Sequence, residues 1–108
     1  MKLALFLLPK AEADIDSHCA FIGKTNPEKA LDFDKAVFES LDQLSETPLI
    51  GAEHSYQNPK LFGLRMWFVK GFEKYLIYYR PFGNYIEVVR ILHSAQNRDF
   101  MLSENEGE

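Results

Sequence analysis

Apolar residues recur every three or four positions through most of the first half of the chain, after a short continuous apolar run. The run from Leu3 to Leu8 ends at Pro9, which predicts a first β-strand. The following stretch predicts a helix to about residues 23–24, because its apolar and small side chains share one helical face: Ala11, Ile15, His18, Cys19 and Ile22.

A second helix is predicted to start almost at once, at Asn26-Pro27. Asn is a favoured N-cap residue, and proline is favoured at the first helical position. Pro48 and Gly51 end the pattern. So short a link between two helices predicts an antiparallel helical hairpin. The apolar face of the second helix consists of Ala30, Phe33, Val37, Leu41 and Leu44.

The second half of the chain predicts three strands, over residues 61–69, 75–79 and 85–92, each rich in aromatic or β-branched side chains. Turns are expected at 70–73 and 81–84. The order is therefore β-α-α-β-β-β, an α+β fold with an antiparallel sheet and the helical hairpin packed on one face. We expect a single domain over residues 1–102 and an acidic, disordered tail over 103–108.

Alternation along 61–69 separates two sets of side chains. Phe62, Leu64, Met66 and Phe68 form the more apolar set, which we expect to face the core, whereas Arg65, Trp67 and Val69 lie on the other face with Gly63. Such a sheet would bury one face fully and keep aromatic surface beside arginines on the other, a common composition for a binding face.

Charge is unevenly distributed. Residues 1–50 hold five Lys and nine acidic residues, residues 51–102 hold seven Lys or Arg and four acidic residues, and the last six residues add three more acids. The division either reflects ordinary helix and strand composition or marks a cationic sheet surface for an acidic partner or phosphates. A single cysteine, Cys19, and the lack of any apolar stretch of membrane-spanning length favour a cytoplasmic protein.

The residues show no motif for a cofactor, and we expect none. His18, His54 and His93 are scattered without metal-ligand spacing, and no glycine-rich phosphate loop is present. Asp14 and Asp16 are expected on a solvated helix face. The remaining candidates are cationic and aromatic side chains on the sheet, which could hold RNA or a protein partner.

Several segments together resemble the ParE branch of the ParE/RelE superfamily of bacterial type II toxins. The similarity is carried by 13–15, 26–27, Leu64-Arg65, the run Gly71-Phe72 to Tyr75-Leu-Ile-Tyr-Tyr-Arg80, and Ile86-x-Val-x-Arg-Ile-Leu-His93. The resemblance covers the chain to about residue 102 and implies the same β-α-α-β-β-β fold.

The resemblance also implies a ParD-like antitoxin as partner and one of two activities. ParE-like toxins poison DNA gyrase, whereas RelE-like toxins cleave messenger RNA at the ribosome with basic side chains and a proton-transferring group. For cleavage, this chain could offer Arg65, Arg80 and His93. Phe100 stands where RelE-like toxins commonly carry a tyrosine, and a phenyl ring cannot transfer a proton, so binding is favoured over cleavage.

The leading hypothesis is a ParE-like toxin that binds a macromolecular target, provisionally gyrase, and is neutralised by its antitoxin. The alternatives are a ribosome-dependent endoribonuclease and a non-toxic remnant that only binds the antitoxin. The residues expected to contact target or antitoxin are Arg65, Trp67, Tyr79, Arg80, Arg90, His93 and Arg98.

Overall fold

The computed structural model describes residues 2–53, 61–96, 98 and 101–102. The predicted tail at 103–108, His54 and Phe100 lie outside the described residues. The elements are β1 (Ala4–Leu7), α1 (Pro9–Gly23), α2 (Pro27–Glu46), β2 (Ala52–Glu53), β3 (Arg65–Val69), β4 (Phe72–Pro81) and β5 (Tyr85–His93).

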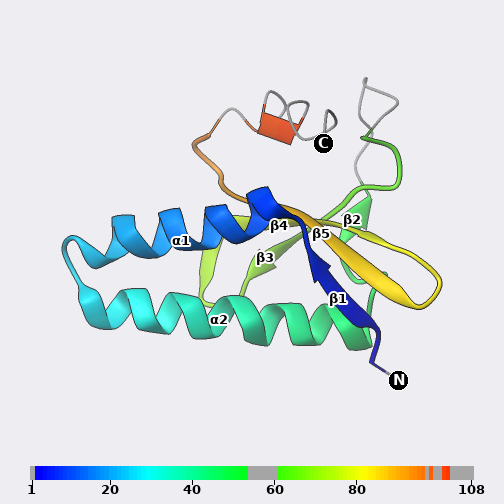
Figure 1. Ribbon diagram of the computed structural model, residues 1–108, viewed down its shortest axis with the longest axis horizontal. Helices are drawn as coiled ribbons and strands as arrows, with labels where there is room; N and C mark the ends of the chain where they lie inside the picture. Colours follow the sequence, from blue (N-terminus) through cyan, green and yellow to red (C-terminus); the bar gives the residue numbers. More distant parts are fainter. Residues whose placement is uncertain (1, 54–60, 97, 99–100, 103–108) are drawn as a thin grey trace.

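The five strands form one sheet in the order β1-β5-β4-β3-β2, and the two helices form a hairpin along it (Figure 1). Strands β3, β4 and β5 are a meander of antiparallel neighbours, as predicted. The α+β class and the packing of the helical hairpin against the sheet are therefore confirmed. The two-residue strand β2, which pairs antiparallel with β3, was not expected.

Strand β1 joins the sheet parallel to β5, which makes the sheet mixed. Ala4 is the register partner of Tyr85, and Leu7 is that of Val88. The connection between β1 and β5 contains both helices and strands β2 to β4, which exceeds the length that parallel neighbours require. β1 covers only the first half of β5, and the half from Val89 to His93 extends beyond it.

Local sequence explains where the helices begin. Pro9 is the first residue of α1, where its missing N–H has no partner to lose. At the start of α2 the Asn26 side chain accepts a hydrogen bond of 3.1 Å from the Lys29 backbone N–H, so the predicted N-cap is confirmed.

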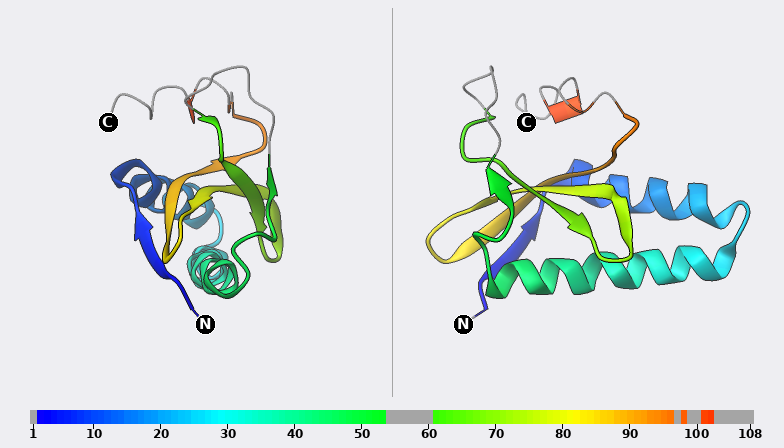
Figure 2. Two further views of the ribbon diagram at one scale, coloured as in Figure 1. Left: turned by 90° about the vertical axis from the view of Figure 1, so that its right-hand side faces the viewer. Right: turned by 180° about the vertical axis from the view of Figure 1, so that it is seen from behind.

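The main core lies between the helices and one face of the sheet. Its members include Phe33 and Leu41 from α2 and Ile77, Val88 and Ile91 from the sheet. Figure 2 shows both helices on this side of the strands. The helical periodicity predicted these core positions of α2 correctly.

The predicted core set of residues 61–69 is correct only in part: Phe62 is 66% exposed, whereas Leu64, Met66 and Phe68 pack in a second buried cluster on the face away from the helices. Val69 and Trp67 are the side chains of β3 that pack toward the helices. Residues 61–64 are not in the strand, since Leu64 N–H donates to the Leu61 carbonyl in a turn where Gly63 has φ of +81°. Alternation assigns side chains to two faces, but it does not say which face the helices cover.

The opposite sheet face also has a buried cluster, so the expectation of one uncovered aromatic face is wrong as well. Its members are Leu61, Leu64, Leu76, Tyr78, Val89, Leu92 and Leu102. Leu102 and the partly buried Met101, which follow β5 in the sequence, pack on this face. Both faces of the central strands are therefore covered.

Candidate functional site

Arg65 and Tyr79 are register partners on β3 and β4, and together they hold the segment that follows α2. The Arg65 guanidinium donates a 2.7 Å hydrogen bond to the carbonyl of Gly51 and lies 3.5 Å from the Glu53 carboxylate. It is partly exposed. Arg65 therefore supports the fold locally while keeping part of its surface accessible.

Tyr79 is fully buried, and its hydroxyl bridges two backbone groups. It accepts a hydrogen bond of 2.9 Å from Gly51 N–H and donates one of 2.8 Å to the Pro48 carbonyl. Burial raises the pKa of the phenol, because the phenolate would lose its hydration. Tyr79 is among the residues expected to contact target or antitoxin, but its side chain is a buried part of the core.

The remaining aromatic candidate, Trp67, is partly exposed. Its ring stacks on that of Phe68 with centroids 4.5 Å apart. The two rings line a shallow groove with Ser40 and Lys70, where α2 passes β3. Trp67 thus combines packing against the core with an accessible edge.

Arg90 is 6% exposed and forms a buried ion pair with Asp14 of α1. Two hydrogen bonds, of 2.7 and 2.8 Å, join the guanidinium to the two carboxylate oxygens, the bidentate geometry that suits arginine. The prediction that Asp14 is solvated is wrong, whereas Asp16 is exposed as expected. Because Arg90 is not accessible, we remove it from the predicted contact residues.

Asp14 and His18 are one helical turn apart on α1, and both bond to the backbone of Ile91. Ile91 N–H donates to Asp14 at 2.9 Å, and the ring nitrogen Nε2 of His18 lies 2.8 Å from the Ile91 carbonyl. A carbonyl can only accept, so Nε2 carries the proton. These two side chains therefore provide hydrogen-bond partners for the backbone of β5 at a position that β1 does not reach.

Burial lowers the pKa of His18 below its usual 6.5, because desolvation penalises the imidazolium more than the bond to Ile91 stabilises it. The ring packs edge-on against Tyr75 and Phe33. His18 therefore lies at a helix flank against the core, as predicted, and it acts as a neutral donor.

His93 ends β5 and is partly exposed. Its Nδ1 accepts a 3.0 Å hydrogen bond from Ala95 N–H, so in the neutral ring the proton lies on Nε2. The ring meets the edge of Tyr75 at a centroid distance of 4.8 Å. Tyr75 and His93 are register partners, which fixes this arrangement through the sheet.

Arg80 and Arg98 are partly exposed and lie on the sheet face opposite the helices. Arg80 donates to the Phe62 carbonyl at 3.3 Å and forms a 3.8 Å ion pair with Glu87, its register partner. Arg98 donates to the Tyr78 hydroxyl at 3.1 Å, on the face where the second buried cluster lies.

The predicted catalytic set does not come together. His93 pairs with Tyr75 at one end of the β4–β5 ladder, and Arg80 lies five residues further along β4. At about 3.3 Å per residue the two positions are roughly 16 Å apart along the strand. Arg65 pairs with Tyr79, whose side chain faces the helices, whereas the next residue, Arg80, faces the other way.

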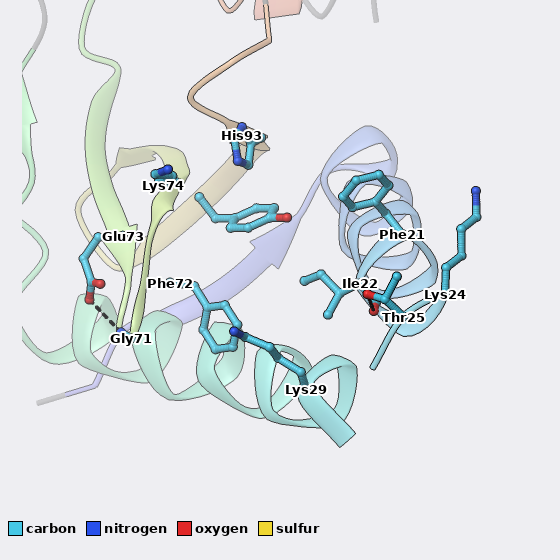
Figure 3. A pocket seen from close by; sticks show the side chains of 11 residues that line it. Phe21, Ile22, Lys24, Thr25, Lys29, Gly71, Phe72, Glu73, Lys74 and His93 are labelled. Atoms are coloured by element: carbon cyan, nitrogen blue, oxygen red, sulfur yellow. Dashed lines mark hydrogen bonds between the residues drawn. The ribbon is translucent and has the colours of Figure 1, made fainter. Parts of the chain in front are cut away.

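A cavity that the sequence did not reveal lies beside His93, between the end of α1, the start of α2 and the β3–β4 turn (Figure 3). Its volume is about 510 Å³. The residues that line it are Phe21, Ile22, Lys24, Thr25, Lys29, Gly71, Phe72, Glu73, Lys74, Tyr75 and His93. No local motif marks it, because its walls come from three separate parts of the chain.

Two classes of site have no counterpart in residues 2–53, 61–96, 98 and 101–102. No group of three or more His, Cys, Asp or Glu is placed to hold a metal ion there. In the same residues, no helix has the length and apolar character needed to cross a bilayer.

The cysteine, Cys19, is partly buried beside the Ala30 carbonyl, and desolvation raises the pKa of its thiol.

Comparisons with known proteins agree on one family. The sequence model for the ParE toxin of the type II toxin–antitoxin system parDE matches residues 5–98. A solved structure described as the chromosomal ParDE toxin–antitoxin system from P. aeruginosa is similar to this fold, with a TM-score of 0.69 and 25% identity. The similarity covers 85% of this chain and 96% of that one. No curated protein matches the sequence significantly. With most of its length matched, the chain belongs to the ParE toxin family of type II toxin–antitoxin systems.

Proposed function

We propose that this ParE-type toxin stops growth by binding a macromolecular target, provisionally DNA gyrase, and that a ParD-like antitoxin neutralises it. Gyrase is proposed because the ParE branch, which the sequence resembles, poisons this enzyme. The alternative within the superfamily is cleavage of messenger RNA at the ribosome.

The separation of the candidate catalytic groups is the observation that favours binding over cleavage. Attack by a ribose 2′-hydroxyl needs a base, a cation and an acid around a single phosphate. Arg80 and His93 lie roughly 16 Å apart along β4, counted at about 3.3 Å per residue, and Arg65 faces the other way from Arg80. Groups so placed do not contact one phosphate together.

The accessible side chains suit recognition of a partner. Arg65, Trp67, Arg80, His93 and Arg98 are each partly exposed and remain candidates for contacts with target or antitoxin. They lie on both faces of the sheet, with Trp67 on the helix side and Arg98 on the other, so a protein partner that contacts all of them must wrap around the sheet.

The direct test is expression in bacteria without the antitoxin. We expect growth arrest with DNA breaks that depend on gyrase, while ribosome-bound messages stay intact. Co-expression of the product of an adjacent antitoxin gene should restore growth.

Two results would replace the proposal. Cleaved ribosome-bound message that disappears in Arg65→Ala or His93→Ala would make the protein a nuclease. Normal growth at good soluble yield, with the antitoxin still bound, would make it a non-toxic remnant.

A further inference from the structure

The cavity beside His93 has an apolar floor that packs directly on the protein core. Phe72 and Tyr75 both pack against the buried ring of Phe33, with centroids 5.2 and 4.7 Å away. The His93 ring also packs edge-on against the ring of Tyr75. A floor fixed in this way needs no rearrangement to receive a side chain, which lowers the cost of binding.

One wall of the cavity is an exposed aromatic residue. Phe21 is 68% exposed near the end of α1, although it lines an apolar depression. Figure 3 shows its ring across the opening from Phe72, with Ile22 between them. An exposed apolar surface around a preformed depression is typical of a surface that a partner covers.

The rim of the cavity is cationic. Lys24, Lys29 and Lys74 line it, and the only carboxylate among the lining residues, Glu73, accepts a 2.7 Å hydrogen bond from Gly71 N–H. Within the described part of the chain, none of the three ammonium groups lies within ion-pair distance of a carboxylate. The lysines are therefore available to an acidic ligand.

We propose that this cavity binds an acidic segment of the antitoxin, which inserts one bulky apolar side chain between Phe21 and Phe72 while its carboxylates pair with Lys24, Lys29 and Lys74. The inference rests on the proposed function, because it names the partner's chemistry at a site of the same toxin. A protein is favoured over a nucleic acid because the lysines surround an apolar depression and do not follow a groove that could track phosphates.

Charge reversal tests the rim. We compare Lys24→Glu/Lys74→Glu with a matched control, Lys10→Glu/Lys35→Glu, which changes the net charge equally but lies outside the cavity. Affinity for the purified product of the adjacent antitoxin gene is measured by calorimetry at several salt concentrations. The cavity variant should bind at least about tenfold more weakly and with a smaller salt dependence, and the control should stay within about twofold.

Truncation of the exposed Phe21 ring tests the aromatic wall. Phe21→Ser should weaken binding at least about tenfold, whereas Phe38→Ser, at a ring that is 51% exposed on α2 and outside the cavity, should change it little. Neither ring belongs to the buried core, so both variants should keep the parent's thermal unfolding midpoint.

The outcomes separate this inference from the proposed function. If the antitoxin binds every variant equally and still restores growth, the toxin assignment stands and the cavity assignment is false. If the adjacent gene product does not bind the parent protein, both the cavity assignment and the proposed function fail. If the lysine variant keeps its antitoxin affinity but loses binding of a 12-nucleotide single-stranded probe, the cavity is a nucleic-acid site and the inference is overturned.

Discussion

The Asp14 carboxylate holds the Arg90 guanidinium through two hydrogen bonds, of 2.7 and 2.8 Å, between the first helix and the last strand. It also accepts from Ile91 N–H, so a single carboxylate satisfies a buried cation and a backbone donor. The pair thus connects α1 to β5 across a sequence separation of 76 residues.

Asp14→Asn should destabilise the protein by about 3–5 kcal/mol, because it removes the negative charge that pairs with a buried guanidinium through two hydrogen bonds. The control Asp16→Asn, at an exposed position of the same helix, should change the free energy of unfolding by less than about 0.5 kcal/mol. Urea unfolding followed by circular dichroism measures both. A loss below about 1 kcal/mol for Asp14→Asn would show that the pair contributes no more than a surface ion pair.

Stability should fall as the pH drops through the range just below 6.5, in part because of His18. The unfolded chain takes up a proton on His18 near its usual pKa of 6.5, whereas the folded protein does so only at lower pH, so protonation favours unfolding. His18→Gln keeps a donor for the Ile91 carbonyl but does not titrate. Its free energy of unfolding should depend less on pH between 7 and about 5, and curves parallel to the parent's would contradict this assignment.

Tyr79→Phe should cost about 1–3 kcal/mol, because Gly51 N–H would lose its buried acceptor. Tyr85→Phe is the control, since its ring packs near the surface against Phe6 and Phe82. Thermal unfolding compares the two variants. Equal midpoints would mean that water replaces the missing hydroxyl.

Gly51→Ala should be strongly destabilising, because the buried backbone of Gly51 lies against the Tyr79 ring. A Cβ there would lie 2.8 Å from a ring carbon of Tyr79 and 2.9 Å from the Met66 carbonyl oxygen. We expect a loss above about 2 kcal/mol, as found for overpacked core sites. Gly83→Ala is the matched control, because a Cβ at Gly83 meets no atom within 4 Å. A similar small effect for both would show that the segment after α2 moves away at little cost.

The sequence predicted those parts of the fold that depend on local patterns. Apolar periodicity located both helices, and the Asn26-Pro27 pair placed the start of α2. Of the turn expected at 70–73, residues 70–71 form the turn, where Gly71 has φ of +83°, and β4 begins at Phe72. Each of these features depends on residues close together in the sequence, which is the range over which a periodic pattern is informative.

The failures concern contacts between distant residues. Asp14 looked like one of many helix carboxylates, and only its position opposite Arg90 makes it a buried partner. The cavity beside His93 likewise combines the α1–α2 link with the β3–β4 turn. For the same reason the sequence could not say that Arg65 and Arg80 face opposite sides of the sheet.

The parallel pairing of β1 with β5 has a consequence for biosynthesis. The partner of Ala4 is Tyr85, so β1 has no neighbour in the sheet until β5 has been made. Contacts of such long range make folding slow and leave apolar surface exposed in the incomplete chain. The five-stranded sheet is therefore complete only after β5 has been synthesised and has paired with β1.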